Sequence, residues 1–407
     1  MLIKNAYIEN DKNLSDILIK DGVIKKIARS VPQGGEEVLD LGGKLMIPPY
    51  VDSHLHLDTT HSVDYALSKG TLWSGIACWN ETKKNLTVSD VRERALRAVR
   101  AAVSRGVQHI RTHIDVCAPN TTALEAMLDL KRELRDICNI QIIAFPQEGI
   151  LSFKDCKARI ESALRAGADG IGGIPHYEYT REYSVGSMNY VIDLAVSTGA
   201  LVDVHCDETD DDSSRGLETL AARALEAGIG ERVAASHTTA MHSYSDAYMN
   251  RLMRVLIRSG INFVANPLIN IHLQGRFDGY PKRRGFTRVK ELTEAGLNVS
   301  FGQDDVKDPW YPMGNGNMTD VIHMGLHIGH MTTYGEILNS YKFATHNGAK
   351  TLCLKGYGIA EGNAASFIVM DAENFFDVVC DKREALYSFN KGKIIARTEA
   401  AKRTVYF

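Results

Sequence analysis

Histidines and an aspartate that could bind a metal ion stand where predicted strands end. His54 and His56 close the run "VDSHLHLD", and side chains two apart on a strand point to the same side, so both imidazoles can face one site. His205 lies near the end of "VDVHCDE", His237 near that of "AASHTTA" and Asp304 near that of "SFGQDD". Neutral imidazoles with a carboxylate suit Zn²⁺ or Fe²⁺ and leave a position open for water. The set predicts a metal centre.

Further polar residues are expected at the same edge. Gln147 and Glu148 follow the apolar run "IIAFP", Glu208 follows the third of the histidines, and Asp305 directly follows Asp304. One polar residue near a strand end is usually a packed or surface residue. Several such ends in one chain are hard to explain by packing, so they indicate an active site.

The middle of the chain predicts the elements that must position these side chains. Eight short apolar runs alternate with longer helical patterns between residues 48 and 354. This repetition favours a parallel sheet, and its extent matches a (β/α)8 barrel of the TIM type, whose active sites lie at the C-terminal strand ends. A doubly wound sheet is the alternative. It would need a glycine-rich phosphate turn after its first strand, and "GADGIGGIP" has the wrong spacing.

The two ends of the chain have a different pattern. Residues 1–47 and 355–407 alternate apolar and polar positions, with glycine-containing turns between the runs. We therefore expect a small β-sandwich domain formed by these N- and C-terminal segments. Residues 48–354 would form the metal-dependent barrel.

The composition excludes several classes of partner. The 407 residues are 44% hydrophobic and 24% charged, and their net charge of −3 argues against nucleic acid or an anionic membrane as the main partner. Neither an apolar signal core nor a run of 18 apolar residues occurs in the sequence. Seven cysteines without a CxxC pair are typical of reduced thiols. We expect a cytoplasmic protein.

The order of the motifs resembles that of the amidohydrolase superfamily: HxH on strand 1, His on strands 5 and 6, and Asp on strand 8. Longer phrases narrow the resemblance to the bacterial cytosine deaminases, over essentially the whole chain. They include "HLHLDTT", "FPQEGILS", "IPHYEYTREY", "SHTTAMHSY" and "DDVKDPWYPMG". No bridging lysine is evident at the fourth strand end, "GGIPHY", which suggests one metal ion rather than two.

The resemblance implies roles for the matching residues. Asp304 would be both a ligand and a proton acceptor, His237 would hydrogen-bond the attacking water, and Glu208 would carry protons to the ring. One divalent ion, zinc, iron or manganese, would be bound by His54, His56, His205 and Asp304. The substrate would be contacted by Gln147, Asp305, Trp310, Leu72 and Phe145. Gln147 would read the amide edge of a pyrimidine.

These roles predict a metal-dependent hydrolytic deaminase that converts cytosine, or a 5-substituted cytosine such as 5-methylcytosine, to a uracil-type product and ammonia. The small-molecule substrate would be a nucleobase, and a homo-oligomer is expected from the family. One alternative is deamination of another heterocycle, such as isoguanine or creatinine. Cyclic amide hydrolysis is a second, against which Glu208 and the missing lysine count. A non-catalytic binding protein is a third, but it would be expected to have lost ligands.

One position departs from the family pattern. Bacterial cytosine deaminases carry histidine where this chain has Gln303, directly before Asp304. Strand alternation turns Gln303 away from Asp304, so its effect would be indirect. A flexible amide could let Asp305 shift and open space near ring C5. The departure therefore predicts acceptance of 5-substituted cytosines.

Three other polar features are interpreted as structural. His113 is expected to support the site from behind or to pack in the core. The histidines of "HMGLHIGH" are expected to pack along a helix. The acidic run "DETDDDSS" at 207–214 is expected, apart from Glu208, to be a solvated loop.

Overall fold

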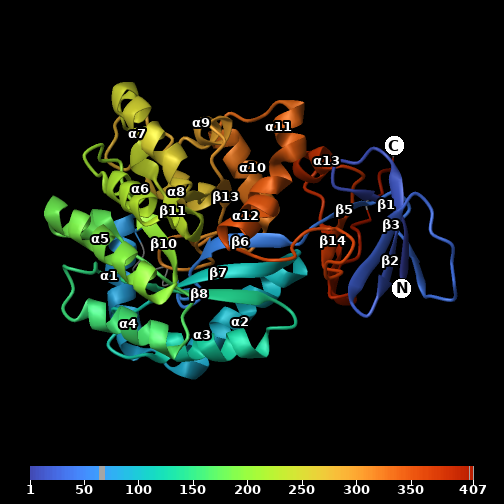
Figure 1. Ribbon diagram of the computed structural model, residues 1–407, viewed down its shortest axis with the longest axis horizontal. Coiled ribbons are helices and arrows are strands. Elements are labelled where there is room, and N and C mark those ends of the chain that lie inside the picture. Colours follow the sequence, from blue (N-terminus) through green and yellow to red (C-terminus); the bar gives the residue numbers. More distant parts are fainter. Residues whose placement is uncertain (64–68, 403, 407) are drawn as a thin grey trace.

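The computed structural model describes residues 1–63, 69–402 and 404–406. Within those residues, eight parallel strands pair in the order β13-β12-β11-β10-β9-β8-β7-β6. A backbone bridge between Leu55 and Asp304 brings the two outer strands together, so the sheet is a nearly closed barrel. Figure 1 shows this barrel with its helices on one side of the molecule and a separate sheet on the other. The predicted (β/α)8 barrel is confirmed.

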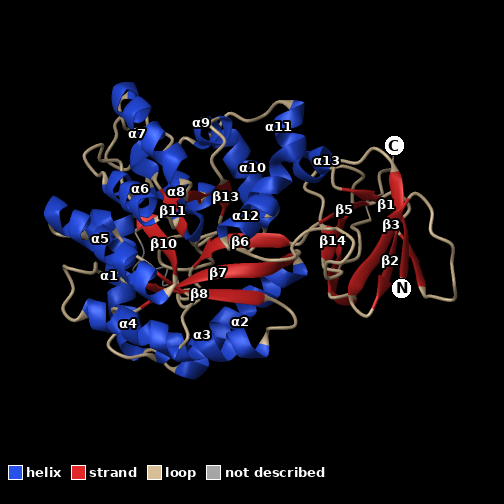
Figure 2. Ribbon diagram, viewed as in Figure 1, coloured by secondary structure: helices blue, strands red, loops and turns tan. Residues whose placement is uncertain are grey.

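Each of the eight predicted runs contains one barrel strand. The strands are β6 (Tyr50–Leu55), β7 (Val107–Asp115), β8 (Asn139–Phe145), β9 (Gly170–Ile171), β10 (Leu201–Cys206), β11 (Val233–His237), β12 (Asn262–Ala265) and β13 (Val299–Phe301). Helices surround them (Figure 2). These are α1 (Leu72–Thr82), α2 (Val88–Ser104), α3 (Thr122–Glu133), α4 (Cys156–Ala166), α5 (Arg181–Thr198), α6 (Gly216–Ala227), α7 (Asp246–Ser259), α8 (Pro267–Leu273), α9 (Val289–Glu294), α10 (Met318–Ile328), α11 (Tyr334–Asn339) and α12 (His346–Thr351).

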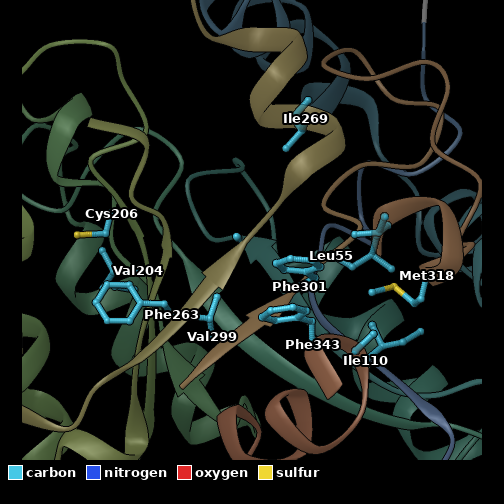
Figure 3. Close-up of a cluster of buried hydrophobic side chains, with 14 of the residues drawn as sticks. Leu55, Ile110, Val204, Cys206, Phe263, Ile269, Val299, Phe301, Met318 and Phe343 are labelled. Atoms are coloured by element: carbon cyan, nitrogen blue, oxygen red, sulfur yellow. The ribbon is translucent and has the colours of Figure 1, made fainter. Parts of the chain in front are cut away.

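Helix α2 is amphipathic, and strand β6 is buried on both faces. In α2, Val91, Ala95 and Ala98 recur at helical spacing on the buried face, and the Thr87 side chain caps the first turn. Strand β6 is buried along its whole length, as expected for a parallel strand with side chains packed on both sides. Phe301 stacks on Phe343 (Figure 3). Their ring centroids are 4.4 Å apart. This packing fixes the strand ends that carry the polar residues.

Strands from both termini form the second sheet, as the sequence predicts. Its order is β16-β15-β14-β5-β1-β2-β3, with β4 paired to β1, so the strands are hydrogen-bonded in one continuous sheet. The elements are β1 (Leu2–Ile8), β2 (Leu14–Lys20), β3 (Val23–Ala28), β4 (Val38–Asp40), β5 (Leu45–Ile47), β14 (Phe367–Met370), α13 (Phe375–Cys380), β15 (Ala385–Asn390) and β16 (Lys393–Arg397). A separate apolar cluster includes Ile17, Phe367 and Phe389. Domain boundaries at 47/48 and 354/355 stay a prediction.

The cysteines and the lengths of the helices bear on the expectations from composition. No disulfide is formed among the seven cysteines, all of which lie in the described part of the chain. Among the helices of the described residues, none is both long enough and apolar enough to cross a membrane.

Candidate active site

Four predicted ligands meet at the C-terminal end of the barrel. The Nε2 atom of His205 lies 3.2 Å from that of His54 and 2.9 Å from that of His56. The Oδ1 atom of Asp304 lies 3.4 Å from His54 Nε2 and 3.5 Å from His56 Nε2. All four side chains are buried. This cluster could hold a metal ion.

The donor set fits a divalent ion. Ligand atoms of a tetrahedral zinc ion lie roughly 3.4 Å apart, close to the spacing seen here. Burial and the neighbouring imidazoles hold the pKa values of His54 and His205 well below the ordinary range, so these rings are neutral and each has a lone pair to offer. Burial and the nearby Glu208 raise the pKa of Asp304 well above its usual range. A cation at this point would relieve both the repulsion between lone pairs and the cost of an ionised Asp304.

His237 and Glu208 form a second layer over the ligands. The Nδ1 atom of His237 lies 3.2 Å from Glu208 Oε1 and 3.7 Å from Asp304 Oδ2. His237 and Asp304 have φ values of 66° and 67°, in a left-handed region that residues with a Cβ rarely adopt. Such strain is often found at functional sites, because it turns a side chain where the strand alone would not place it. Burial raises the pKa of Glu208 to about 8, so this carboxyl group is protonated at neutral pH.

A small cavity opens onto these groups. Its polar and apolar lining residues are His56, Leu72, Gln147, Ile174, His205, Glu208, His237, Ile269, Leu273, Asp304, Asp305 and Trp310. Nine of the eleven predicted site residues line this cavity. His54 is not among the lining residues but belongs to the ligand cluster. Phe145, predicted near the substrate ring, is not among the described lining residues and instead stacks on His205, with centroids 4.0 Å apart.

The wall that contains Asp305 and Trp310 is held by Asp308, which the sequence analysis did not identify. Asp308 Oδ1 accepts hydrogen bonds from the backbone N–H groups of Trp310 and Tyr311, at 3.0 Å each. Its other oxygen accepts one from the Thr59 hydroxyl at 2.9 Å. These bonds fix the turn after Asp305. The "DxxDPW" spacing was the only signal that could have indicated this role.

Helix α1 packs directly against the indole of Trp310. A Cβ atom added at Gly75 would lie 2.4 Å from Trp310 Cδ1, so only glycine allows this approach. Leu72, one turn earlier on α1, lines the cavity. The position of α1 therefore sets the width of the site on this side.

Gln303 is not among the described residues that line the cavity. Strand β13 ends at Phe301, so the expected strand alternation does not set the orientation of this side chain. Its side chain is fully buried, and its Oε1 atom accepts a hydrogen bond from the backbone N–H of Gly316 at 3.1 Å. Its Nε2 atom donates to the carbonyl oxygen of Asp305 at 3.4 Å. Gln303 therefore contacts the backbone, and not the carboxyl group, of the residue that lines the cavity.

Two asparagines that sequence reasoning missed hold His237. Asn270 Nδ2 lies 3.0 Å from His237 Nδ1, and Asn266 Nδ2 lies 3.3 Å from His237 Nε2. Both are buried. They stand four residues apart in "NPLIN", at the start of α8, and this i, i+4 spacing after a strand end was the available signal.

The expectation of a solvated acidic loop at 207–214 is wrong for Asp207. This residue is buried, and its carboxylate accepts hydrogen bonds from the backbone N–H groups of Gly216 and Leu217 at 2.9 and 2.8 Å. These are orphan donors at the start of α6, which explains why a charged group is retained there. Asp207 thus anchors the segment that carries Glu208.

Comparison with known proteins gives the family. The model of the amidohydrolase family matches residues 84–396. A solved structure of 5-methylcytosine deaminase from Klebsiella pneumoniae, liganded with 5-fluorocytosine, is 45% identical, covers 100% of this chain and 99% of its own, and has a TM-score of 0.97. N-isopropylammelide isopropyl amidohydrolase from Pseudomonas sp. (strain ADP) is 28% identical over 98% of each chain. Pterin deaminase from Rhizobium rhizogenes (strain K84 / ATCC BAA-868) is 26% identical over 94% of this chain and 88% of its own. The chain belongs to the amidohydrolase family and is a hydrolase.

The raised pKa of Glu208 predicts a pH-dependent stability of the metal-free protein. This carboxyl group ionises near 4.5 in the unfolded chain but at about 8 in the folded protein. Its contribution to the free energy of unfolding is therefore full below pH 4.5 and is lost as pH rises towards 8. We expect the Tm of metal-free wild type to fall relative to that of metal-free Glu208→Gln between pH 5 and 8. Glu93→Gln, on the exposed face of α2, should show no such trend. Parallel Tm curves for wild type and Glu208→Gln would contradict the shift.

Proposed function

We propose that this chain is a metal-dependent deaminase that converts cytosine and 5-methylcytosine to uracil and thymine, with release of ammonia. The observation that carries the proposal is the cavity in which a buried, protonated Glu208 faces the ligand cluster. The 45% identity to 5-methylcytosine deaminase over the whole chain supports the substrate class.

The proposed mechanism depends on which groups at the site can donate a proton and which can accept one. His54, His56, His205 and Asp304 would hold one divalent ion, which when bound lowers the pKa of water from 15.7 to about 7. Glu208, protonated at neutral pH, can give its proton to ring N3 and make C4 electrophilic. Asp304 can accept a proton from the attacking water.

In the remaining steps one bond at C4 forms, another breaks, and both protons of the water molecule are transferred. The water oxygen bonds to C4, and the bond from C4 to the exocyclic nitrogen breaks. One of the two protons of water ends on ring N3 and the other on the departing amine, which leaves as ammonia. Glu208 lies 3.2 Å from His237, so the pair can orient the water and pass the second proton.

Substrate orientation would depend on the polar part of the cavity wall. The side chain of Gln147 carries both a donor and an acceptor and can pair with the amide edge of a pyrimidine. Leu72 and Trp310 would pack against the ring. Asp305 would face the side of the ring that carries C5.

The test is a screen for ammonia release, with metal content measured on the same preparation. Cytosine, 5-methylcytosine, isoguanine and creatinine form the basic set. Pterin and N-isopropylammelide are added because relatives at 26% and 28% identity are named for them, and hydrolysis of the second is measured by the release of isopropylamine instead of ammonia. We expect the highest kcat/KM with a cytosine-type ring. A higher value with any other compound would replace the proposed substrate, and a metal-free active enzyme would refute the mechanism.

Gln303→His is expected to lower the ratio of 5-methylcytosine turnover to cytosine turnover about tenfold, a change of roughly 1.4 kcal/mol. Imidazole cannot repeat both backbone contacts of the Gln303 amide, so the wall at Asp305 would move towards C5. The measurement is kcat/KM for both substrates on one preparation, because the ratio does not depend on the fraction of active protein. An unchanged ratio would show that Gln303 does not set the preference.

Three finer expectations belong to the same proposal. We infer zinc or iron as the native ion, with manganese as the other candidate, because imidazole and carboxylate accept all three. We also infer a homo-oligomer and a cytoplasmic location. Elemental analysis, light scattering and cell fractionation address these in turn.

A further inference from the structure

A chain of buried polar groups lies behind His54, on the side opposite to the ligand cluster. The Nδ1 atom of His54 is 2.9 Å from the hydroxyl oxygen of Ser236, on β11. That hydroxyl donates to Asp203 Oδ1, on β10, at 2.5 Å. Asp203 Oδ2 accepts a hydrogen bond from Arg111 Nη1, on β7, at 2.9 Å. None of these four side chains is more than 1% exposed.

The number of protons available on these four side chains determines which group donates and which accepts in each hydrogen bond. An aspartate paired with an arginine is ionised, so Asp203 can only accept. Ser236 has one hydroxyl proton, which it donates to Asp203. The Ser236 oxygen must therefore accept from His54, which places the proton of a neutral His54 on Nδ1. The lone pair of His54 is then on Nε2, the atom that faces His205.

The side chain of Arg111, at the other end of this series of hydrogen bonds, is also held in place. Arg111 donates through Nη2 to the carbonyl oxygen of Thr351 at 2.9 Å, and through Nε to Gln141 Oε1 at 3.2 Å. The ring of His113 stacks on that of His54, with centroids 3.9 Å apart. Arg111 therefore cannot move away from Asp203 without losing buried bonds, and His54 cannot rotate freely.

We propose that Ser236 and Asp203 are positioning residues that hold His54 in the tautomer required for metal binding. This inference rests on the metal centre of the proposed function. The hydroxyl and the carboxylate never touch the ion; they act by keeping a proton on Nδ1 and a lone pair on Nε2. Partners behind a ligating histidine typically change metal affinity 10- to 100-fold when removed.

The same region could instead hold a second ion, since His54, His113 and Asp203 also lie within reach of one another. Both oxygens of Asp203 already accept strong bonds from Ser236 and Arg111. The Arg111 guanidinium would also repel a cation here. We therefore assign the group to proton positioning, and a count of bound ions distinguishes the two.

The first experiment measures the zinc affinity of the metal-free full-length protein by competition with a chelating dye. Ser236→Ala should weaken Zn²⁺ binding at least about tenfold. The matched control is Ser300→Ala, because Ser300 is equally buried on a barrel strand but bonds to Thr351 and the Phe263 carbonyl. Equal losses in both variants, an unchanged affinity in folded Ser236→Ala, or two ions per wild-type chain would overturn the inference.

The second experiment needs no metal, so it separates this inference from the proposed function. Long-range ¹H–¹⁵N spectra of histidine-labelled, metal-free protein report which ring nitrogen carries the proton. We expect the Nδ1–H form for His54 in wild type and a shift towards Nε2–H in Ser236→Ala. An Nε2–H signal in wild type would overturn the inference even if zinc binds. A wild type with the Nδ1–H form that binds no ion would refute the proposed function alone.

Discussion

Glu208→Gln is expected to keep the metal ion and to lose turnover by about 10² to 10⁴-fold, the usual contribution of a positioned proton donor. Glutamine preserves the shape of the side chain and the backbone bond from residue 208 to His176. It cannot supply a proton to ring N3 or return one to the leaving amine. The measurements are kcat with cytosine and 5-methylcytosine, and metal ions per chain by elemental analysis.

The control for this prediction is Glu93→Gln, an identical change on the surface of α2. It should leave kcat unchanged. Near-normal turnover in Glu208→Gln would remove Glu208 from the mechanism. Loss of the metal ion together with turnover would instead make Glu208 part of the metal site, which the neighbouring cluster of Glu208, His237 and Asp304 would then explain.

His205→Ala is expected to lose both the metal ion and at least about 99.9% of the turnover. The Nε2 atom of His205 is the nearest to both other imidazoles of the cluster, so its removal takes away the central ligand. Without the ion, water at the site regains a pKa near 15.7, far from the value of about 7 needed for attack at neutral pH. Elemental analysis and the ammonia assay measure the two losses.

A histidine outside the cluster provides the control. His327 lies on α10 and is exposed, and its ring is tilted by 40° to that of His323, with centroids 4.3 Å apart. His327→Ala should retain the metal ion and the activity. If it loses the ion while His205→Ala retains it, the helix rather than the barrel end holds the metal, and the assignment of the site fails.

The clustering of the candidate ligands could be predicted because each follows a predicted strand end. An HxH pair on a strand points to one side, and the strand ends of a parallel barrel meet, so His54, His56 and Asp304 were expected in one cluster. Their assignment as metal ligands stays a prediction. The same reasoning placed Gln147 and Asp305 at the cavity. All five are among the residues that the structure brings together at this end of the barrel.

The supporting residues could not be predicted, because their partners are distant in the chain. Arg111 and Asp203 are separated by 92 positions, and Asp308 is separated from Thr59 by 249. The local sequence does not show which distant residue each of them contacts. Asp207 is an example of a wrong prediction made for this reason. Its acidic neighbours suggested a solvated loop, whereas its carboxylate accepts hydrogen bonds from backbone N–H groups at the start of the next helix.

The bridge between Leu55 and Asp304 has a consequence for how the barrel is closed. The backbone N–H of Asp304 donates to the His54 carbonyl at 2.8 Å, and that of His56 donates to the Asp304 carbonyl at 3.0 Å. First and last strands of the barrel thus meet at residues that are themselves the candidate ligands. An ion bound there would crosslink the first and last strands of the barrel. It would link residues about 250 positions apart in the chain through the same atoms that serve the reaction. Binding of the ion would then add stability to a closure that the backbone hydrogen bonds already make.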